Sequence, residues 1–203
     1  TGSASTVLSE LTWVDRNGKP AGTVGNPGEA TDQMAVELSP DGTRAALSVL
    51  NASGDGRNIW IYDLVRGVRT RFTFDQADDV RAIWSPEGKR LVFSSTRKGG
   101  TLALYEKAID GAGSDDPVQT DPLNLYASSW SRDGRYILYH TGGSGSPTGN
   151  DVWALPMVGE RKPVALAQSS FNEALGRFSP DARWVAYESN ESGRVDVYVT
   201  GFP

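Results

Sequence analysis

Cysteine is absent from this chain of 203 residues, and histidine occurs only once, as His140. The lack of cysteine excludes disulfides, thiolate catalysis and cysteine-based zinc sites. It fits either an extracytoplasmic protein that avoids thiols or a chance absence, and we expect an extracytoplasmic (periplasmic or cell-surface) location. A single histidine cannot build a histidine-rich metal site, so we expect neither a metal nor a cofactor.

Long apolar runs and clusters of basic residues are also lacking. No run of about 18 apolar residues occurs, so the sequence predicts no segment that inserts into a membrane. The net charge is −5, and binding to nucleic acid needs clustered Lys and Arg, so nucleic acid is not an expected partner. The first residues lack the basic and apolar regions of a secretory signal and do not begin with Met, which suggests a processed or excised domain.

Turn residues are abundant, with 23 glycines and 11 prolines, and one turn phrase occurs four times. It reads LSPDG at 38–42, WSPEG at 84–88, WSRDG at 130–134 and FSPDA at 178–182, and its acidic residues are 46, 46 and 48 positions apart. Proline presets φ, Asp bonds the local backbone, and Gly supplies positive φ. The phrase therefore predicts a tight hairpin turn, and its acids are not expected to be catalytic.

Each turn phrase is followed by two short apolar strands that a Gly- or Ser-rich hairpin separates, and then by a further short run. A four-stranded unit that recurs every 46 to 48 residues is typical of a β-propeller. We predict a single all-β domain over 1–203, made of four-stranded antiparallel blades. Its repeat units are approximately 32–75, 78–121, 124–168 and 172–203, with a partial blade from the N-terminal strands at 11–25.

The core between blades is predicted from residues that share a place in the repeat. Three such columns are Leu38/Trp84/Trp130/Phe178, Leu47/Phe93/Tyr139/Tyr187 and Trp60/Trp153/Tyr198. In the last column the second repeat is aligned with Ala103, which predicts a smaller packing contact there.

These repeats resemble a known family. The segments LSPDGTRAALSV, WSPEGKRLVFSS and FSPDARWVAYESNESGRVDVYV are similar to the TolB-type propeller repeat, which also occurs in the propellers of prolyl oligopeptidase-like enzymes. The head, LTWVDRNGKPAGTVGNPG, and the tail, YESNESGRVDVYVTGFP, look like the C-terminal sensor propellers of bacterial serine/threonine kinases. The resemblance implies a propeller fold, and it says less about function because many scaffolds reuse this repeat.

One polar column suggests a binding site. Six residues before each bulky residue of the turn phrase stand Asp32, Asp78, Asn124 and Asn172, and Asp79 and Glu173 follow two of them. This segment enters the innermost strand of each blade, so these side chains are expected to converge on one mouth of the channel. An acidic mouth would favour basic peptide segments or cations. The alternative is that Asp and Asn cap local turns.

Catalytic motifs are not found. The sequence contains no kinase loops, and GGSGSP at 142–147 fails the G-x-S-x-G pattern because Ser146 replaces the second Gly. His140 falls in a column with Ser48, Ser94 and Glu188, so we expect it on a strand surface. We predict that this chain is not an enzyme.

Three functions remain open. The first is a non-catalytic propeller that binds a protein, a peptide or another ligand, as a sensor domain of a larger bacterial signalling protein would. The second is the accessory gating propeller of a prolyl oligopeptidase-like peptidase. The third is a structural repeat fragment that assembles with its own copies.

The ends of the chain both break inside a blade. The head supplies strands that resemble a third and a fourth strand, whereas the last unit stops after its third. Residues 11–14 would lie beside residues 197–199 if the ring closed. We expect instead an open arc that associates with itself through its free blade edges.

Overall fold

The fold is described from a computed structural model, which covers residues 9–28, 31–51, 54–111, 117–143 and 145–202. Within the strands, the side chains of residues 9–10, 25–28 and 31–35 are not described. The described residues form strands, turns and connecting segments, and they contain no helix that is long and apolar enough to cross a membrane. The all-β prediction is confirmed.

Three sheets are complete four-stranded antiparallel blades whose strands follow one another in chain order. The first blade contains β3 (Thr31–Leu38), β4 (Arg44–Leu50), β5 (Arg57–Asp63) and β6 (Val68–Arg71). The second blade contains β7 (Asp79–Trp84), β8 (Arg90–Ser95), β9 (Ala103–Ala108) and β10 (Pro117–Gln119). The third blade contains β11 (Asn124–Trp130), β12 (Tyr136–Gly142), β13 (Val152–Pro156) and β14 (Val164–Ala167).

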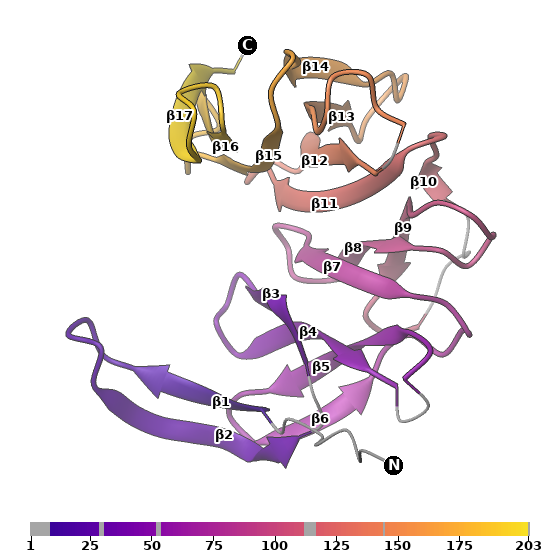
Figure 1. Cartoon of the computed structure of the whole chain (residues 1–203). Helices are drawn as coiled ribbons and strands as arrows, with labels where there is room; N and C mark the ends of the chain where they lie inside the picture. Colours follow the sequence, from indigo (N-terminus) through magenta and orange to yellow (C-terminus); the bar gives the residue numbers. More distant parts are fainter. Residues whose placement is uncertain (1–8, 29–30, 52–53, 112–116, 144, 203) are drawn as a thin grey trace, which may run out of the picture.

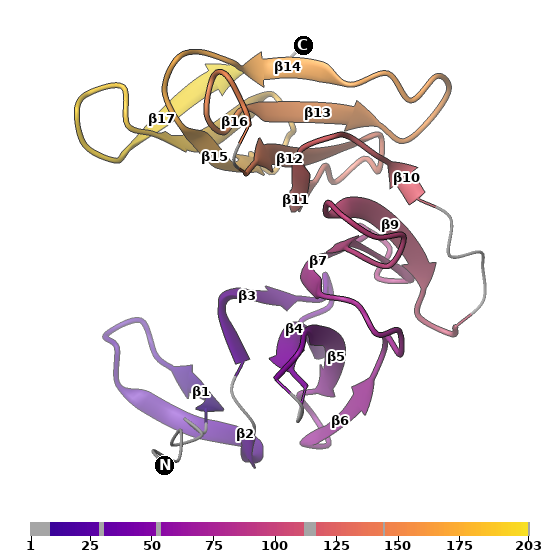
Figure 2. The same ribbon diagram turned by 45° about the vertical axis from the view of Figure 1, so that its right-hand side comes forward.

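The two ends of the chain form incomplete sheets. The fourth blade has β15 (Glu173–Phe178), β16 (Trp184–Ser189) and β17 (Asp196–Gly201), and the head forms a hairpin of β1 (Ser9–Val14) and β2 (Pro20–Gly28). The blades follow one another along an arc, with the head hairpin beside the first blade and the fourth blade at the other end (Figures 1 and 2). Where the structure describes the chain, β1 pairs with β2 alone and β17 with β16 alone, so the head strands do not close the ring.

The recurring turn is held by hydrogen bonds within a few residues. In the first blade the Gly42 amide donates to the Ser39 carbonyl at 2.8 Å, and the Ser39 hydroxyl donates to the Asp41 carboxylate at 2.6 Å. The Thr43 amide donates to the same carboxylate oxygen at 3.0 Å. These bonds, led by the one from Ser39, lower the Asp41 pKa to about 2. In the fourth repeat Ala182 takes the place of Gly42 and adopts a φ of 55°.

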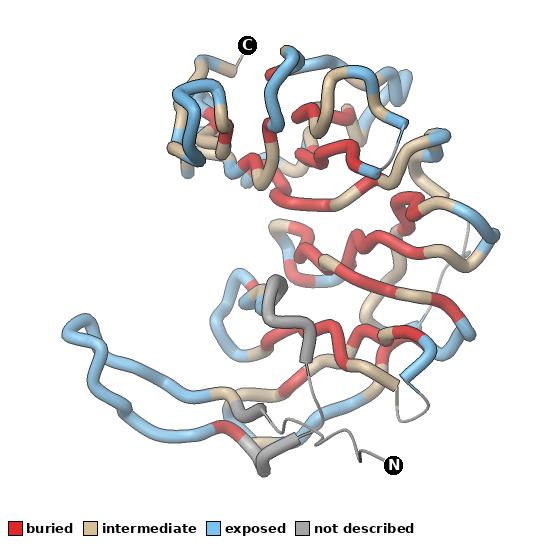
Figure 3. The backbone as a smooth tube through the Cα atoms, viewed as in Figure 1, coloured by how far each residue is buried: buried red, intermediate tan, exposed pale blue. Residues whose placement is uncertain are grey.

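The blades pack face to face, and their buried residues lie where two blades meet (Figure 3). One core cluster joins the first two blades and includes Ile59, Phe72 and Phe93. A second cluster joins the second and third blades and includes Leu104, Ile137 and Leu155. The smaller clusters lie beneath the head hairpin and between the last two blades. Each blade therefore covers one face of its neighbour, as the repeat predicts.

The prediction of a weak contact at Ala103 is wrong. Strand pairing places Tyr105 opposite Phe93, just as Trp60 lies opposite Leu47 and Trp153 opposite Tyr139. Tyr105 is 1% exposed and its ring stacks on Phe93 with centroids 6.2 Å apart. The aromatic column is therefore unbroken, and the misalignment arose because the hairpin before β9 differs in length from the others.

The column at the start of the turn phrase is buried only in the middle of the arc. Trp84 is 5% and Trp130 is 8% exposed, but Leu38 is 48% exposed, so the prediction that Leu38 lies in the core is wrong. Trp84 has another blade on its N-terminal side, and its indole N–H donates to the Glu37 carbonyl at 3.0 Å. Leu38 has only the two-stranded head hairpin on that side, which leaves an apolar gap of about 250 Å³ beside Leu11.

The far face of the fourth blade is uncovered. Strand pairing makes Val197 the equivalent of Ile59, Leu104 and Val152, because these residues lie opposite Glu188, Ser48, Ser94 and His140 respectively. The first three blades bury this position completely against the next blade, with 0% exposure, whereas Val197 is 72% exposed. The neighbouring Val199 is 63% and Trp184 is 52% exposed.

Candidate functional site

The predicted polar column links each blade to the one before it. The Asp78 carboxylate accepts from the Arg57 amide at 3.0 Å and from the Arg57 guanidinium at 3.0 Å. The Asn124 side-chain oxygen accepts from the Leu102 amide at 2.8 Å. In each case the donor lies at the start of the third strand of the preceding blade. These oxygens therefore hold neighbouring blades together rather than capping a turn within one blade.

Asn172 occupies the same place in the fourth blade, where its side-chain oxygen accepts from the Asn150 amide at 3.2 Å. The backbone amide of Asn172 donates to the side-chain oxygen of Asn190 at 2.9 Å, within the fourth blade. Gly149 allows this approach, because an added Cβ there would meet the Asn172 oxygen at 2.7 Å. The side chain of Asp32 lies outside the described residues.

Asp79 and Glu173, the other predicted site residues, lie in the interior. Asp79 is 0% exposed and pairs with the Arg97 guanidinium at 3.3 Å. Arg97 in turn lies over the rings of Phe93 and Tyr105. Glu173 is 3% exposed and accepts from the Ser169 hydroxyl at 2.5 Å. Both carboxylates are therefore buried rather than open to solvent at a channel mouth.

A different group of residues surrounds an open cavity at the axis of the arc. Its volume is about 290 Å³, and it lies among the first strands of all four blades. Its charged lining consists of Glu37 from β3, Arg81 from β7, Arg177 from β15 and Glu188 from β16. Ala127, Ser128 and Leu175 are among the remaining lining residues. Cations and anions are thus present in equal number.

The backbone of the inner strands is irregular at this cavity. Pairing shifts register between Val80 and Ile83 in the second blade and between Ala174 and Arg177 in the fourth. The residues at these breaks, Arg81 and Leu175, have φ of 53° and 56°, a region that costs a side-chain-bearing residue about 1–2 kcal/mol. Both residues line the cavity. Backbone strain of this kind gathers at functional sites, where surrounding structure maintains it.

The two ends of the arc meet across this cavity through one ion pair. The Arg177 guanidinium contacts both carboxylate oxygens of Glu37 at 3.2 Å, although 140 residues separate them. Burial raises the Glu37 pKa, and the attraction of Arg177 lowers it by less. The guanidinium of Arg81 lies 5.6 Å from the centre of the Tyr126 ring. The Arg177 side chain is 56% exposed and can still contact another anion.

The sequence alone did not single out this cavity, although a signal was present. Glu37, Arg81 and Arg177 lie three to five positions after the polar column, and each is a charged residue within an inner strand. These three residues line the axial cavity, whereas Asp79 and Glu173, which lie in the same inner strands, are buried. The polar column drew attention instead because it recurs in every repeat.

The placement of His140 corrects another prediction. His140 was expected on a strand surface, but it is 5% exposed and stacks on Tyr126 with ring centroids 5.0 Å apart. Burial, followed by repulsion from Arg81, lowers the His140 pKa to about 3. The fourth blade covers this side of β12, which the polar character of the column did not reveal.

The described residues do not gather three metal-ligating side chains in one place. Ser144, the serine of the failed hydrolase pattern, lies outside the described residues. The site is therefore an axial cavity with mixed charge, built from strand side chains of all four blades.

Comparison with curated proteins finds a partial relative, and no family model matches the chain. The protein named uncharacterized peptidase YuxL, from Bacillus subtilis (strain 168), is 35% identical over 106 residues. The match covers 50% of this chain and 16% of YuxL. The match thus concerns about half of this chain and a small part of the relative.

Comparison with solved structures concerns nearly the whole chain. TolB from Acinetobacter baumannii has a TM-score of 0.75 at 19% identity, over 95% of this chain and 46% of TolB. Hydrazine synthase from Kuenenia stuttgartiensis scores 0.66 at 15% identity, over 97% of this chain and 66% of that one. Prolyl oligopeptidase B from Galerina marginata has a TM-score of 0.62 at 11% identity, over 89% of this chain and 27% of that one.

These likenesses show the fold. The chain is a TolB-like β-propeller of four-stranded blades, as its repeats predicted. It spans less than half of the A. baumannii TolB chain. The expected likeness to kinase sensor propellers is not supported by these neighbours.

Proposed function

We propose that this TolB-like propeller is a non-catalytic binding module whose axial cavity takes a short peptide segment carrying both positive and negative charge. The observation that carries the proposal is the mixed lining, in which Arg81 and Arg177 face the same cavity as Glu37 and Glu188. Complementary charges give specificity to a binding surface. The cavity volume of about 290 Å³ is near the lower end of the roughly 300–1,000 Å³ that ligand sites span.

In this proposal the arginines receive carboxylates of the ligand and the glutamates receive its ammonium groups. The pair of Arg177 and Glu37 closes the cavity between the first and fourth blades, and a zwitterionic segment would insert between its members. Asp78, Asn124 and Asn172 serve the site indirectly, because their contacts with the preceding blade set the spacing of the inner strands.

The wider role belongs to the same proposal. A sensor role in a larger bacterial protein would use this cavity to detect a peptide without chemistry of its own. An extracytoplasmic location is also proposed, and the likeness to TolB supports it. A purified sample that turned over a peptide, an ester or ATP, and lost this activity in His140→Ala, would overturn the non-catalytic part.

Calorimetry with synthetic hexapeptides tests the binding proposal. The panel combines Lys, Glu and uncharged residues, and includes an all-basic peptide because a basic partner was the expectation from sequence. Peptides with both charges are expected to bind best, and Arg177→Gln should weaken them about tenfold, or ~1.4 kcal/mol. Arg183→Gln is the control, since Arg183 is an exposed arginine that pairs with Asp181 in a turn. Equal binding by both variants, or no binding by any peptide, contradicts the proposal.

A second candidate is the accessory propeller of a peptidase, which would control access of substrates. The identity of 35% with part of the protein named peptidase YuxL favours it, together with the likeness to prolyl oligopeptidase B. A G-x-S-x-G elbow encoded in the same gene would support this role. A kinase domain encoded there would favour the sensor role instead.

A further inference from the structure

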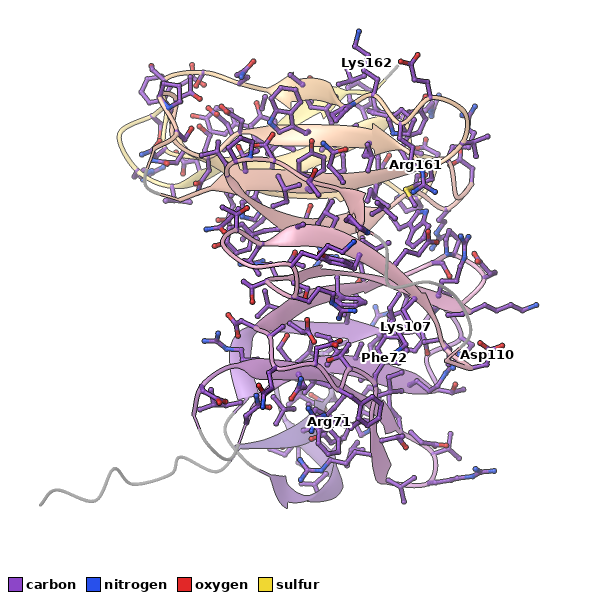
Figure 4. The ribbon with its side chains drawn as sticks, turned by 90° about the vertical axis from the view of Figure 1, so that its right-hand side faces the viewer. Arg71, Phe72, Lys107, Asp110, Arg161 and Lys162 are labelled. Atoms are coloured by element: carbon purple, nitrogen blue, oxygen red, sulfur yellow. The ribbon has the colours of Figure 1, made fainter. Side chains whose placement is uncertain are left out.

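A groove on the outer side of the first two blades has a composition unlike the axial cavity. Its volume is about 420 Å³, and it opens between β5 and β6 of the first blade and the end of β9 in the second. Ile61, Phe72 and Ile109 form an apolar floor that continues the core between the two blades. Figure 4 shows Arg71, Phe72, Lys107 and Asp110 together on this side of the molecule.

Cations outnumber anions in this groove, although the whole chain has a net charge of −5. The cationic lining residues are Arg44, Arg66, Arg71 and Lys107, and the acidic ones are Asp63 and Asp110. Asp63 is already engaged, because its carboxylate accepts from the amides of Val65 and Arg66. The groove therefore has a positive field above an apolar floor.

Lys107 is the residue that sets this groove apart from the other blade boundaries. Strand pairing makes it the equivalent of Tyr62, Leu155 and Thr200, none of which is charged. Leu155 is 0% exposed and Tyr62 is 7% exposed, so the position normally serves packing between blades. A lysine at a packing position is not required by the fold, and it introduces a charge where the other boundaries have none.

The Lys107 ammonium lies 5.4 Å from the centre of the Phe72 ring. Among the residues that the structure describes, no carboxylate lies within ion-pair distance of it. At the edge of the groove Phe74 is 68% exposed, and the Arg71 guanidinium lies over its ring at 5.3 Å. An exposed aromatic ring beside a cation is a contact surface suited to an apolar group that adjoins a carboxylate.

We propose that this groove binds an acidic peptide segment of a partner protein, with an apolar side chain on the floor and a carboxylate at Lys107. Charge complementarity carries the choice of an acidic segment, because the groove is lined by four cationic residues and two acidic ones. The site is separate from the axial cavity, which has an equal number of cations and anions. The proposal therefore does not depend on the proposed function.

Fluorescence anisotropy with a labelled nine-residue peptide of alternating Glu and Leu tests the proposal. A peptide with Gln in place of Glu is the matched ligand control. The acidic peptide should bind, and its affinity should fall several-fold between about 50 and 300 mM salt, because exposed charge attraction is screened over ~10 Å or less. Equal binding of the Glu and Gln peptides would overturn the proposal.

Lys107→Met tests the site itself, because it keeps an unbranched apolar side chain over Phe72 and removes the charge. It should weaken the acidic peptide at least about fivefold, and Phe74→Ala should weaken it by a similar factor. Lys162→Met is the control, since Lys162 is an exposed lysine far from the groove (Figure 4). A thermal scan shows that each variant is folded. An unchanged affinity in Lys107→Met, or an equal loss in Lys162→Met, refutes the assignment.

Discussion

Two valines at equivalent positions of the third and fourth blades should differ sharply in what they contribute to stability. Val152 lies on β13 and Val197 on β17, each opposite the same position of the second strand. Val152 is 0% exposed, and its side chain packs so closely on Gly176 of the fourth blade that a Cβ there would lie 3.0 Å from it. Val197 is 72% exposed.

Val152→Ala removes two buried carbons, which is worth ~1.6 kcal/mol of transfer free energy at ~0.8 kcal/mol each. The cavity left behind adds to this, because β15 cannot collapse fully onto the shortened side chain, so we expect a total loss of about 2–3 kcal/mol. Val197→Ala removes the same atoms from an exposed face. Only the lower strand propensity of alanine remains there, so the loss should be at most about 1 kcal/mol.

Urea unfolding followed by tryptophan fluorescence measures both losses, with linear extrapolation to water. The protein is studied at a concentration where sedimentation shows single chains, so that no second copy covers Val197. Since both changes lie in third strands, the intrinsic preference of valine for a strand cancels between them. Equal losses in the two variants would show that blade-to-blade burial does not account for the stability of Val152.

Three other predictions concern His140, the hydrogen bond between Asp78 and the Arg57 amide, and the open end of the arc. His140 has its pKa depressed to about 3 in the folded chain, against 6.5 as its ordinary value, so protons bind the unfolded state first as pH falls. Stability should decrease by about 2 kcal/mol between pH 8 and pH 5 on this account, and His140→Phe should flatten that part of the stability curve; an unchanged slope contradicts the burial argument. Asp78→Ala should destabilise the chain by about 1–3 kcal/mol in urea unfolding, because it leaves the Arg57 amide without its acceptor. A loss below ~0.5 kcal/mol would contradict the inference that this hydrogen bond holds the first two blades together. Finally, we propose that a second copy covers the exposed far face of the fourth blade, so sedimentation should show dimers or larger species that Val199→Lys converts to single chains; a wild-type chain that stays single at high concentration rules this out.

The fold could be predicted from the sequence because its determinants are local. The turn phrase at 38–42 closes through bonds between residues two to five positions apart, as those of Ser39 and Asp41 show. The spacing of the four phrases then implies equal units, and a sheet with two apolar faces needs a neighbour on each side.

The alignment within a repeat needed the tertiary structure. Ala103 and Tyr105 are both plausible partners of the aromatic column in the sequence, and only strand pairing selects Tyr105. Because the hairpins differ in length, equivalent residues of two blades stand at different distances along the sequence, although their strands pair in the same way. The burial of His140 escaped prediction for a related reason, because whether a polar position faces solvent or the next blade depends on what that blade places against it.

The functional surfaces depended most on the tertiary structure. The polar column is visible in the sequence as a repeated Asp or Asn, but its partners lie about 22 residues earlier, as with Leu102 and Asn124, in the preceding blade. The axial cavity brings Glu37 to Arg177 across 140 residues. The sequence shows that charged residues such as Glu37 and Arg177 occur in the inner strands. The curvature of the arc decides which of them meet, because it sets the distance between the inner strands of different blades.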